Sequence, residues 1–121
     1  MANDSVNIAH DETERLISSS KVEGTAVYDA AGEKLGSVKN FMVEKRTGQV
    51  EYVVLGSGGL FGAGNRHYPI PWQELRYDTE RGGYVTDLGR DRLEGAPSHE
   101  EGADPRYDRD YDDRIRGHYR R

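Results

Sequence analysis

The stretch that decides the fold is Val50-Glu51-Tyr52-Val53-Val54-Leu55. In an extended strand, successive side chains point to opposite faces. The first, third and fifth residues of this stretch are apolar and share one face, whereas Val53 and Leu55 share the other. A strand with apolar side chains on both faces is typical of a sheet interior. We therefore predict that these residues form the central strand of a β-sheet.

Turn signals around this strand predict three hairpins. Segments 29–32 and 45–48 both end in glycine, and the first also begins with aspartate, as a type I turn favours. A third turn at 79–83 contains two glycines. Gly36 disturbs the alternation of the strand that contains it, which predicts a bulge or a sharp bend. The predicted strands are residues 24–28, 35–44, 50–55, 66–72, 75–77 and 84–88.

Two prolines place one of these strands near an edge. In residues 66–72, the side chains of Tyr68, Ile70 and Trp72 alternate onto one face. Pro69 and Pro71 have no backbone N–H, and both missing donors fall on the same side of the strand. This strand is therefore predicted to lie beside a gap or at an edge.

Helical signals in the sequence are short. Ser20 and Glu23 have the spacing of a capping box, and residues 87–94 have room for one further turn before Gly95 and Pro97. Short strands with closely spaced turns predict an all-β barrel or sandwich of about six strands, with one or two single-turn helices.

Apolar residues divide the 121-residue chain into three parts. Residues 16–95 hold nearly all the valine, leucine, isoleucine and phenylalanine and the single tryptophan. We predict a flexible polar segment at 1–15, one domain at 16–96, and a polar mixed-charge tail at 97–121. Two alternatives stay open for the tail: it is flexible, or it becomes a short helix when it docks on a partner.

Charge and composition disfavour several function classes. The net charge is −5 and no basic cluster is present, which disfavours nucleic-acid binding. The chain has no cysteine, so thiolate metal sites and cysteine catalysis are excluded. No apolar run is long enough to span a membrane or to act as a signal peptide. We predict a cytoplasmic protein.

Motifs for catalysis, cofactors or metals fail in detail. Residues 56–64 are rich in glycine, but Phe61 stands where a dinucleotide-binding motif needs glycine, and no lysine follows as a phosphate loop requires. The four histidines are too scattered for a metal motif. Residues 108–112 imitate the start of a calcium loop, but Asp113 replaces its essential glycine. We predict no catalytic residue, no cofactor, no metal and no small-molecule substrate, so the protein is not expected to be an enzyme.

One region has the apolar residues that an interface needs. Leu60 and Phe61 are large apolar residues flanked by glycines, so they either fold back onto the domain or contact another protein. Aromatic residues follow closely, and aromatic anchors favour interfaces. The predicted contact residues for a protein partner or a homodimer are Leu60, Phe61, Tyr68, Pro69, Pro71 and Trp72.

Five segments together resemble the PRC-barrel domain. They are residues 16–20, 24–38, 48–54, 58–72 (which includes Gly58-Gly59-Leu60-Phe61-Gly62 and Pro69-Ile70-Pro71-Trp72) and 93–97. This family includes the barrel of photosynthetic reaction-centre H subunits and that of ribosome maturation factors. The resemblance implies a small, strongly bent β-barrel that acts as a docking or assembly module, often in dimers, without a catalytic centre.

The chain is most similar to the stand-alone bacterial type of this family. It lacks the membrane anchor of the H subunits and the second domain of the maturation factors. The resemblance therefore implies a protein-interaction module. Two alternatives are an RNA- or ribosome-associated factor, which the arginines and tyrosines of the tail also favour, and a regulator of photosynthetic electron transfer.

Overall fold

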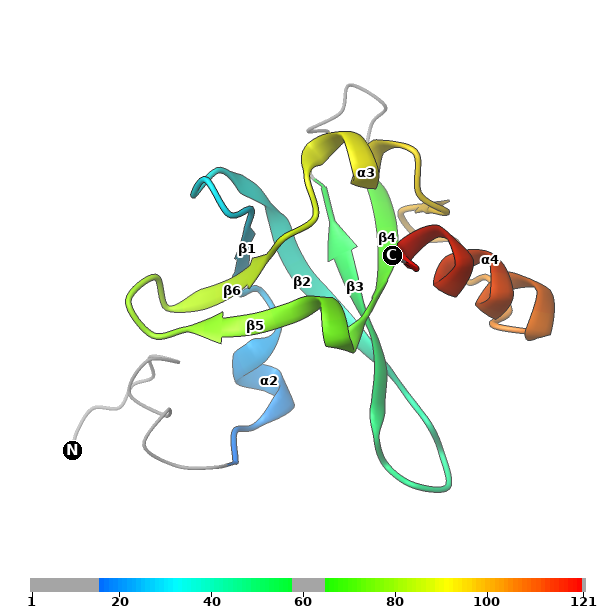
Figure 1. Ribbon diagram of the computed structural model, residues 1–121. Coiled ribbons are helices and arrows are strands. Elements are labelled where there is room, and N and C mark those ends of the chain that lie inside the picture. Colours follow the sequence, from blue (N-terminus) through cyan, green and yellow to red (C-terminus); the bar gives the residue numbers. More distant parts are fainter. Residues whose placement is uncertain (1–15, 58–64, 121) are drawn as a thin grey trace.

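The computed structural model describes residues 16–57 and 65–120 (Figure 1). Its strands are β1 (Ala26–Tyr28), β2 (Lys34–Val43), β3 (Val50–Gly56), β4 (Arg66–Pro71), β5 (Leu75–Asp78), β6 (Gly83–Thr86) and β7 (His99–Glu100). Its helices are α2 (Ser19–Val22), the 3-10 turn η1 (Trp72–Glu74), α3 (Arg90–Glu94) and α4 (Arg109–Tyr119). The segment 1–15 predicted to be flexible lies outside the described residues.

The strands of the described chain form one seven-stranded sheet in the order β5-β6-β1-β2-β3-β4-β7. Neighbouring strands are antiparallel, except for the parallel pair of β1 and β6. Figure 1 shows a strongly bent sheet, in which β5 and β6 turn away from β2 and β3. Within the described residues β5 and β7 are not paired with each other, so the sheet is not closed and a closed barrel is not confirmed.

The strand that was predicted to be central, β3, lies in the interior of the sheet. It pairs with β2 on one side and with β4 on the other. Its residues from Tyr52 to Gly56 are all buried, whichever face they point to. This confirms the prediction from its apolar pattern. The core contains Tyr52, Val53 and Leu55 of this strand and, among others, Val27, Leu35, Ile70, Leu93 and Ile115.

The three predicted hairpin turns are confirmed by their backbone hydrogen bonds. The amide of Gly32 donates to the carbonyl of Asp29, and the amides of Gly48 and Gly82 close the other two turns at 2.8 and 2.9 Å. These glycines have φ of +92°, +77° and +67°. A residue with a Cβ rarely adopts such a conformation, so glycine determines where each turn lies.

Gly36 marks an irregular pairing, as predicted. The register between β1 and β2 shifts between Val27 and Tyr28, opposite the extra residue Leu35. A Cβ on Gly36 would lie only 2.1 Å from the carbonyl oxygen of Gly56. Glycine at this position therefore lets β2 and β3 approach each other where the sheet bends.

The two prolines of β4 lie at an incomplete edge, which also confirms the prediction. β3 pairs with β4 along its length from His67 to Pro71. On the other side, β7 pairs only with Arg66 and His67. Beyond these two residues β4 has no strand neighbour on that side in the described chain. Figure 1 shows α4 beside β4.

One helix prediction was correct and another was wrong. α3 lies within the predicted segment 87–94. α2 does not begin with a capping box at Ser20, because Ser18 is its N-cap and accepts a hydrogen bond from the amide of Ser20. Glu23 is the residue at which α2 ends. Three consecutive serines offered alternative caps, and the sequence alone did not distinguish them.

The C-terminal segment differs from the flexible or partner-docking tail that its composition suggested. Asp108 caps the 11-residue helix α4, and its carboxylate accepts a hydrogen bond from the amide of Tyr111. Tyr111, Ile115 and Tyr119 recur at every fourth position, so they lie on one face of the helix. All three are buried and belong to the core cluster. The tail therefore docks on its own sheet.

Candidate functional site

The hairpin between β2 and β3 carries exposed apolar residues. Phe41, Met42 and Val43 are consecutive at the end of β2, and none of them is fully buried. Val43 is 49% exposed. Figure 1 shows that this hairpin projects beyond the rest of the sheet. A projecting apolar segment of this kind is a candidate contact for another protein.

A row of aromatic rings connects this hairpin to the far end of the sheet. Phe41 meets Trp72 edge to face with ring centres 6.0 Å apart, and Trp72 meets Tyr84 at 5.9 Å. Tyr84 in turn meets Tyr77 at 5.6 Å. The four rings come from β2, η1, β6 and β5. Trp72 is half-buried in this row.

The predicted contact residues differ in how accessible the structure leaves them. Tyr68, Pro69 and Pro71 are buried within the chain, because β4 lies between β3 and α4. Leu60 and Phe61 lie outside the described residues. Among the described members of the predicted set, Trp72 is therefore the one with accessible side-chain surface.

Phe41 and Val43 were not among the predicted contact residues. The sequence did contain a signal for them, because three large apolar residues follow one another directly before a polar turn. A strand end that packs on the core with one face needs an apolar residue only at every second position. The same residues are also typical of an ordinary strand, and only the structure shows that Val43 is exposed while Phe41 and Met42 are partly buried. We refer to Phe41, Val43 and Trp72 as the apolar surface.

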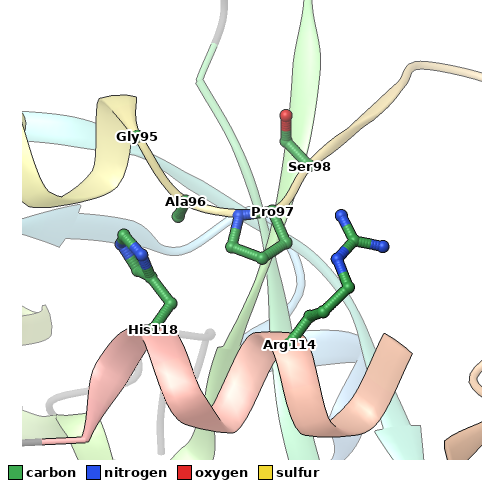
Figure 2. Close-up of a pocket in the computed structure, with 6 residues that line it drawn as sticks. All are labelled: Gly95, Ala96, Pro97, Ser98, Arg114 and His118. Carbon is green, nitrogen blue, oxygen red and sulfur yellow. The ribbon is translucent and has the colours of Figure 1, made fainter. Parts of the chain in front are cut away.

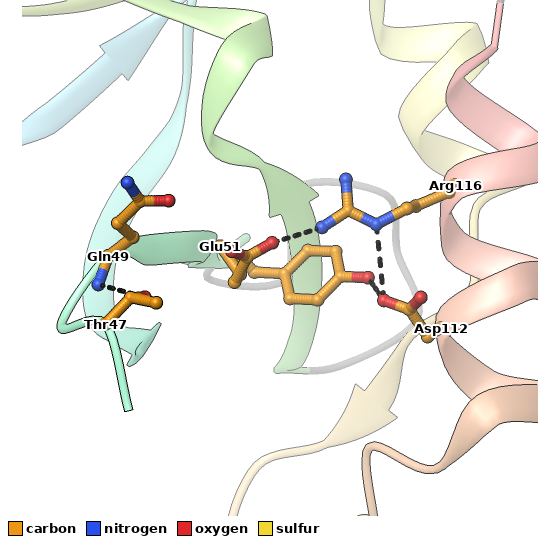
Figure 3. Close-up of polar contacts among 6 residues, drawn as sticks. Thr47, Gln49, Glu51, Asp112 and Arg116 are labelled. Atoms are coloured by element: carbon orange, nitrogen blue, oxygen red, sulfur yellow. Dashed lines mark hydrogen bonds and ion pairs between the residues drawn. The ribbon is translucent and has the colours of Figure 1, made fainter. Parts of the chain in front are cut away.

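A polar network fastens the middle of α4 to the sheet (Figure 3). The guanidinium of Arg116 donates to Glu51 at 2.7 Å and to Asp112 at 3.3 Å. It also lies 4.8 Å from the ring centre of Tyr52, and the hydroxyl of Tyr52 donates to Asp112. This network joins β3 to α4, so it positions the helix rather than a substrate.

The C-terminal end of α4 is held by α3. The guanidinium of Arg92 donates to the carbonyls of His118 and Arg120 at 2.7 and 3.2 Å. A ring nitrogen of His118 lies 2.7 Å from the carbonyl of Arg92. Figure 2 shows His118 and Arg114 reaching from the helix towards the loop at 95–98, across a recess of about 460 Å³. His118 and Arg92 therefore join the end of α4 to α3.

Two histidines face each other across β4 and β7. His67 and His99 are register partners, and their rings meet edge to face with centres 5.5 Å apart. Burial lowers the pKa of His67, and the charges of His99 and Lys39 lower it further, while Glu101 opposes them. Both rings line a recess of about 320 Å³. In the residues that the structure describes, no group of three or more His, Cys, Asp or Glu side chains is arranged to hold a metal ion.

The tyrosines around α4 are strongly shielded from water. Burial raises the pKa of Tyr107 to about 12, and the neighbouring Tyr111 and Asp104 add to the effect. Burial also raises the pKa of Tyr119. These phenols stay neutral at physiological pH, so they contribute to packing. Within residues 16–57 and 65–120, no helix is long and apolar enough to cross a membrane.

Comparison with known proteins agrees with this architecture. Residues 14–93 match the model of the PRC-barrel domain, as the resemblance of the sequence implied. An uncharacterized protein of Deinococcus radiodurans is 29% identical over 70 residues, which cover 58% of this chain. The matched stretch is 24% of that relative, so the two proteins share about a quarter of its length. With the family model covering residues 14–93, the chain belongs to the PRC-barrel domain family.

Proposed function

We propose that this chain is a non-catalytic protein-interaction module whose contact is the apolar surface of Phe41, Val43 and Trp72. The observation that carries the proposal is the end of β2, where Val43 is 49% exposed and Phe41, two residues earlier, is only partly buried and meets Trp72 edge to face. Exposed aliphatic and aromatic residues in one patch favour a protein partner over solvent. Membership of a family of docking modules supports the same function.

The polar network offers no competing catalytic function. Arg116, Asp112 and Glu51 bind one another, and His118 binds α3. A catalytic site needs a nucleophile or base that is free to meet a substrate. That the protein is not an enzyme stays a prediction, and an activity assay would be its direct test.

RNA binding is the less supported alternative. It was motivated by the resemblance to ribosome maturation factors and by the arginines and tyrosines of the tail. Tyrosines stack on bases only when their rings are accessible. Tyr111 and Tyr119 are buried against the sheet, and Tyr107 packs on Tyr52 with ring centres 5.7 Å apart. Regulation of photosynthetic electron transfer stays a prediction from the family. A cytoplasmic location stays a prediction from the sequence, in which no apolar run is long enough for a signal peptide or a membrane span.

The test compares the wild type with Val43→Asp. Light scattering measures self-association, and retention of host proteins on the immobilised chain measures docking on a different partner. Gln49→Asp is the matched control, because Gln49 is exposed in the same hairpin and the charge change is the same. We expect Val43→Asp to abolish the association that the wild type and Gln49→Asp show. Equal behaviour of all three proteins would refute the proposal.

A further inference from the structure

The last helix of the chain reaches the sheet through a short connection. α4 follows β7, a strand of only two residues, through the connecting residues 101–108. Most of these residues are exposed, and Tyr107 is the one that packs on the sheet, with its ring centre 5.7 Å from that of Tyr52. Their backbone hydrogen bonds include those from Glu101 to Asn65 and from Ala103 to Glu100, both at the start of the segment. The helix can therefore be considered as a ligand that is tied to its binding site by a short connection.

The surface that receives α4 contacts its apolar face, its middle and its C-terminal end. We call this surface the α4 seat; it comprises β4, Glu51 and Tyr52 of β3, and Arg92 of α3. The apolar face of the helix lies against it, with Ile115 fully buried. Polar contacts fix both the middle and the C-terminal end, through Arg116 and through the carbonyl of His118.

None of these contacts depends on the helix belonging to the same chain. Glu51 would bind Arg116 of another copy, and Arg92 would bind the carbonyls at the end of another copy's helix, with the same geometry. Exchange of an identical element between copies keeps all native contacts and changes only the connection.

Two features make the docking of α4 incomplete. The hydroxyls of Tyr111 and Tyr119 are buried without a hydrogen-bond partner among the described residues. A buried polar group without a partner weakens the packing that covers it. The ion pair of Arg116 with Glu51 is also about one-third exposed on both sides, so water competes for it. The helix is therefore held less firmly than its apolar face alone implies.

We propose that the α4 seat is an exchangeable helix-binding site, and that its external ligand is the α4 helix of a second copy of this chain. The tether gives the chain's own helix an effective concentration of about 1 mM. An external helix therefore binds an intact chain weakly, and binds at its intrinsic affinity once the chain's own helix is displaced. This inference uses different residues from the apolar surface, so it goes beyond the proposed function.

The test uses the full chain and a fluorescent peptide with the sequence of residues 106–121, and measures peptide anisotropy. Ile115→Asp in the chain displaces its own helix by placing a charge in the core. We expect this variant to bind the wild-type peptide at least ~10-fold more tightly than the intact chain does, because the competing tethered helix is lost. A peptide that itself carries Ile115→Asp is the control and is expected not to bind.

A second experiment, which reverses the charges of one ion pair, tests the proposal if Ile115→Asp does not fold. The chain with Glu51→Arg loses its pair with its own Arg116, and a peptide with Arg116→Glu restores that pair only in the observed register. We expect this chain to prefer the Arg116→Glu peptide over the wild-type peptide, and the wild-type chain to show the opposite preference. Equal binding of both peptides, or no binding to either folded variant, overturns the proposal. Gln49→Asp in the chain is expected to leave peptide binding unchanged.

Discussion

At the scale of single residues, two glycines show how differently the same residue type is used. A Cβ on Gly36 would meet the backbone of β3, whereas a Cβ on Gly117 in α4 would meet nothing within 4 Å. Backbone atoms cannot move aside as a flexible side chain does. Gly36 is therefore required by the approach of two strands, and Gly117 is dispensable.

Alanine substitutions at these glycines should have opposite effects. Gly36→Ala is expected to lower the free energy of unfolding by about 2 kcal/mol or more, because two strands must separate to admit the methyl group. Gly117→Ala is expected to raise it by about 0.5–1 kcal/mol, because alanine is the better helix former. Urea denaturation of the two variants measures both values. A stable Gly36→Ala protein would mean that β2 and β3 do not approach as closely as described.

His67 should make the fold sensitive to mild acid. Its pKa is lowered by burial and then by His99, so the unfolded chain takes up a proton first as the pH falls. The stabilisation is complete above the unfolded pKa, near 6.5, and is lost as the pH falls towards the folded value. We expect the free energy of unfolding to decrease between pH 7 and pH 5, and His67→Gln to flatten that slope.

Glu44 provides the matched comparison for this pH dependence. Hydrogen bonds from the backbone of Thr47 and Arg46 lower the pKa of Glu44, so its stabilisation is lost only as the pH falls below about 4.5. Glu44→Gln should therefore leave the slope between pH 7 and pH 5 unchanged and reduce the slope at lower pH. If His67→Gln has the same slope as the wild type from pH 7 to pH 5, the role of the histidine pair is contradicted.

At the scale of elements, apolar contact should hold α4 more strongly than its ion pairs do. Ile115 is fully buried, and Ile115→Ala is expected to cost about 2–5 kcal/mol of unfolding free energy. The pair of Glu51 and Arg116 is partly exposed, so a double-mutant cycle with glutamine at both positions should give a coupling of no more than about 1 kcal/mol. Urea denaturation measures both quantities. A coupling larger than the cost of Ile115→Ala would reverse this ranking.

The sequence predicted those elements whose position is determined by residues within the element itself. The hairpin turns follow from glycines that adopt positive φ, and the incomplete edge of β4 follows from Pro69 and Pro71, which lack the donors. α4 was less predictable, because its apolar face has only Tyr111, Ile115 and Tyr119 among charged residues. Such a helix is stable only when it is packed, and the sheet surface that receives it comes from residues distant in the sequence.

The candidate contact was only partly predictable for the same reason. Trp72 was named because aromatic residues favour interfaces, and it does keep accessible surface. Tyr68, Pro69 and Pro71 were named as its neighbours, but α4 and β3 cover them. Exposure depends on how far the β2–β3 hairpin extends past the core, which no local pattern specifies. Phe41 and Val43 became candidates only with the structure.

At the scale of the whole molecule, the two contacts proposed above use different residues of the sheet. The apolar surface lies at the projecting hairpin and the aromatic row, and the α4 seat lies along β4 under the C-terminal helix. A bent sheet that is not closed allows both, because one end carries exposed apolar residues while β4 receives a helix instead of another strand. Changes at one contact should therefore leave the other intact.

Trp72 is the only tryptophan of the chain, so its fluorescence reports directly on the apolar surface. Acrylamide quenching of Trp72, followed while the protein associates with itself or with an isolated partner, tests the central claim that this surface is the protein-interaction contact. We predict that quenching decreases on association in the wild type and in Gln49→Asp, and that it stays unchanged in Val43→Asp. Association of the wild type without any change in the quenching of Trp72 would contradict the account, because the contact would then lie elsewhere.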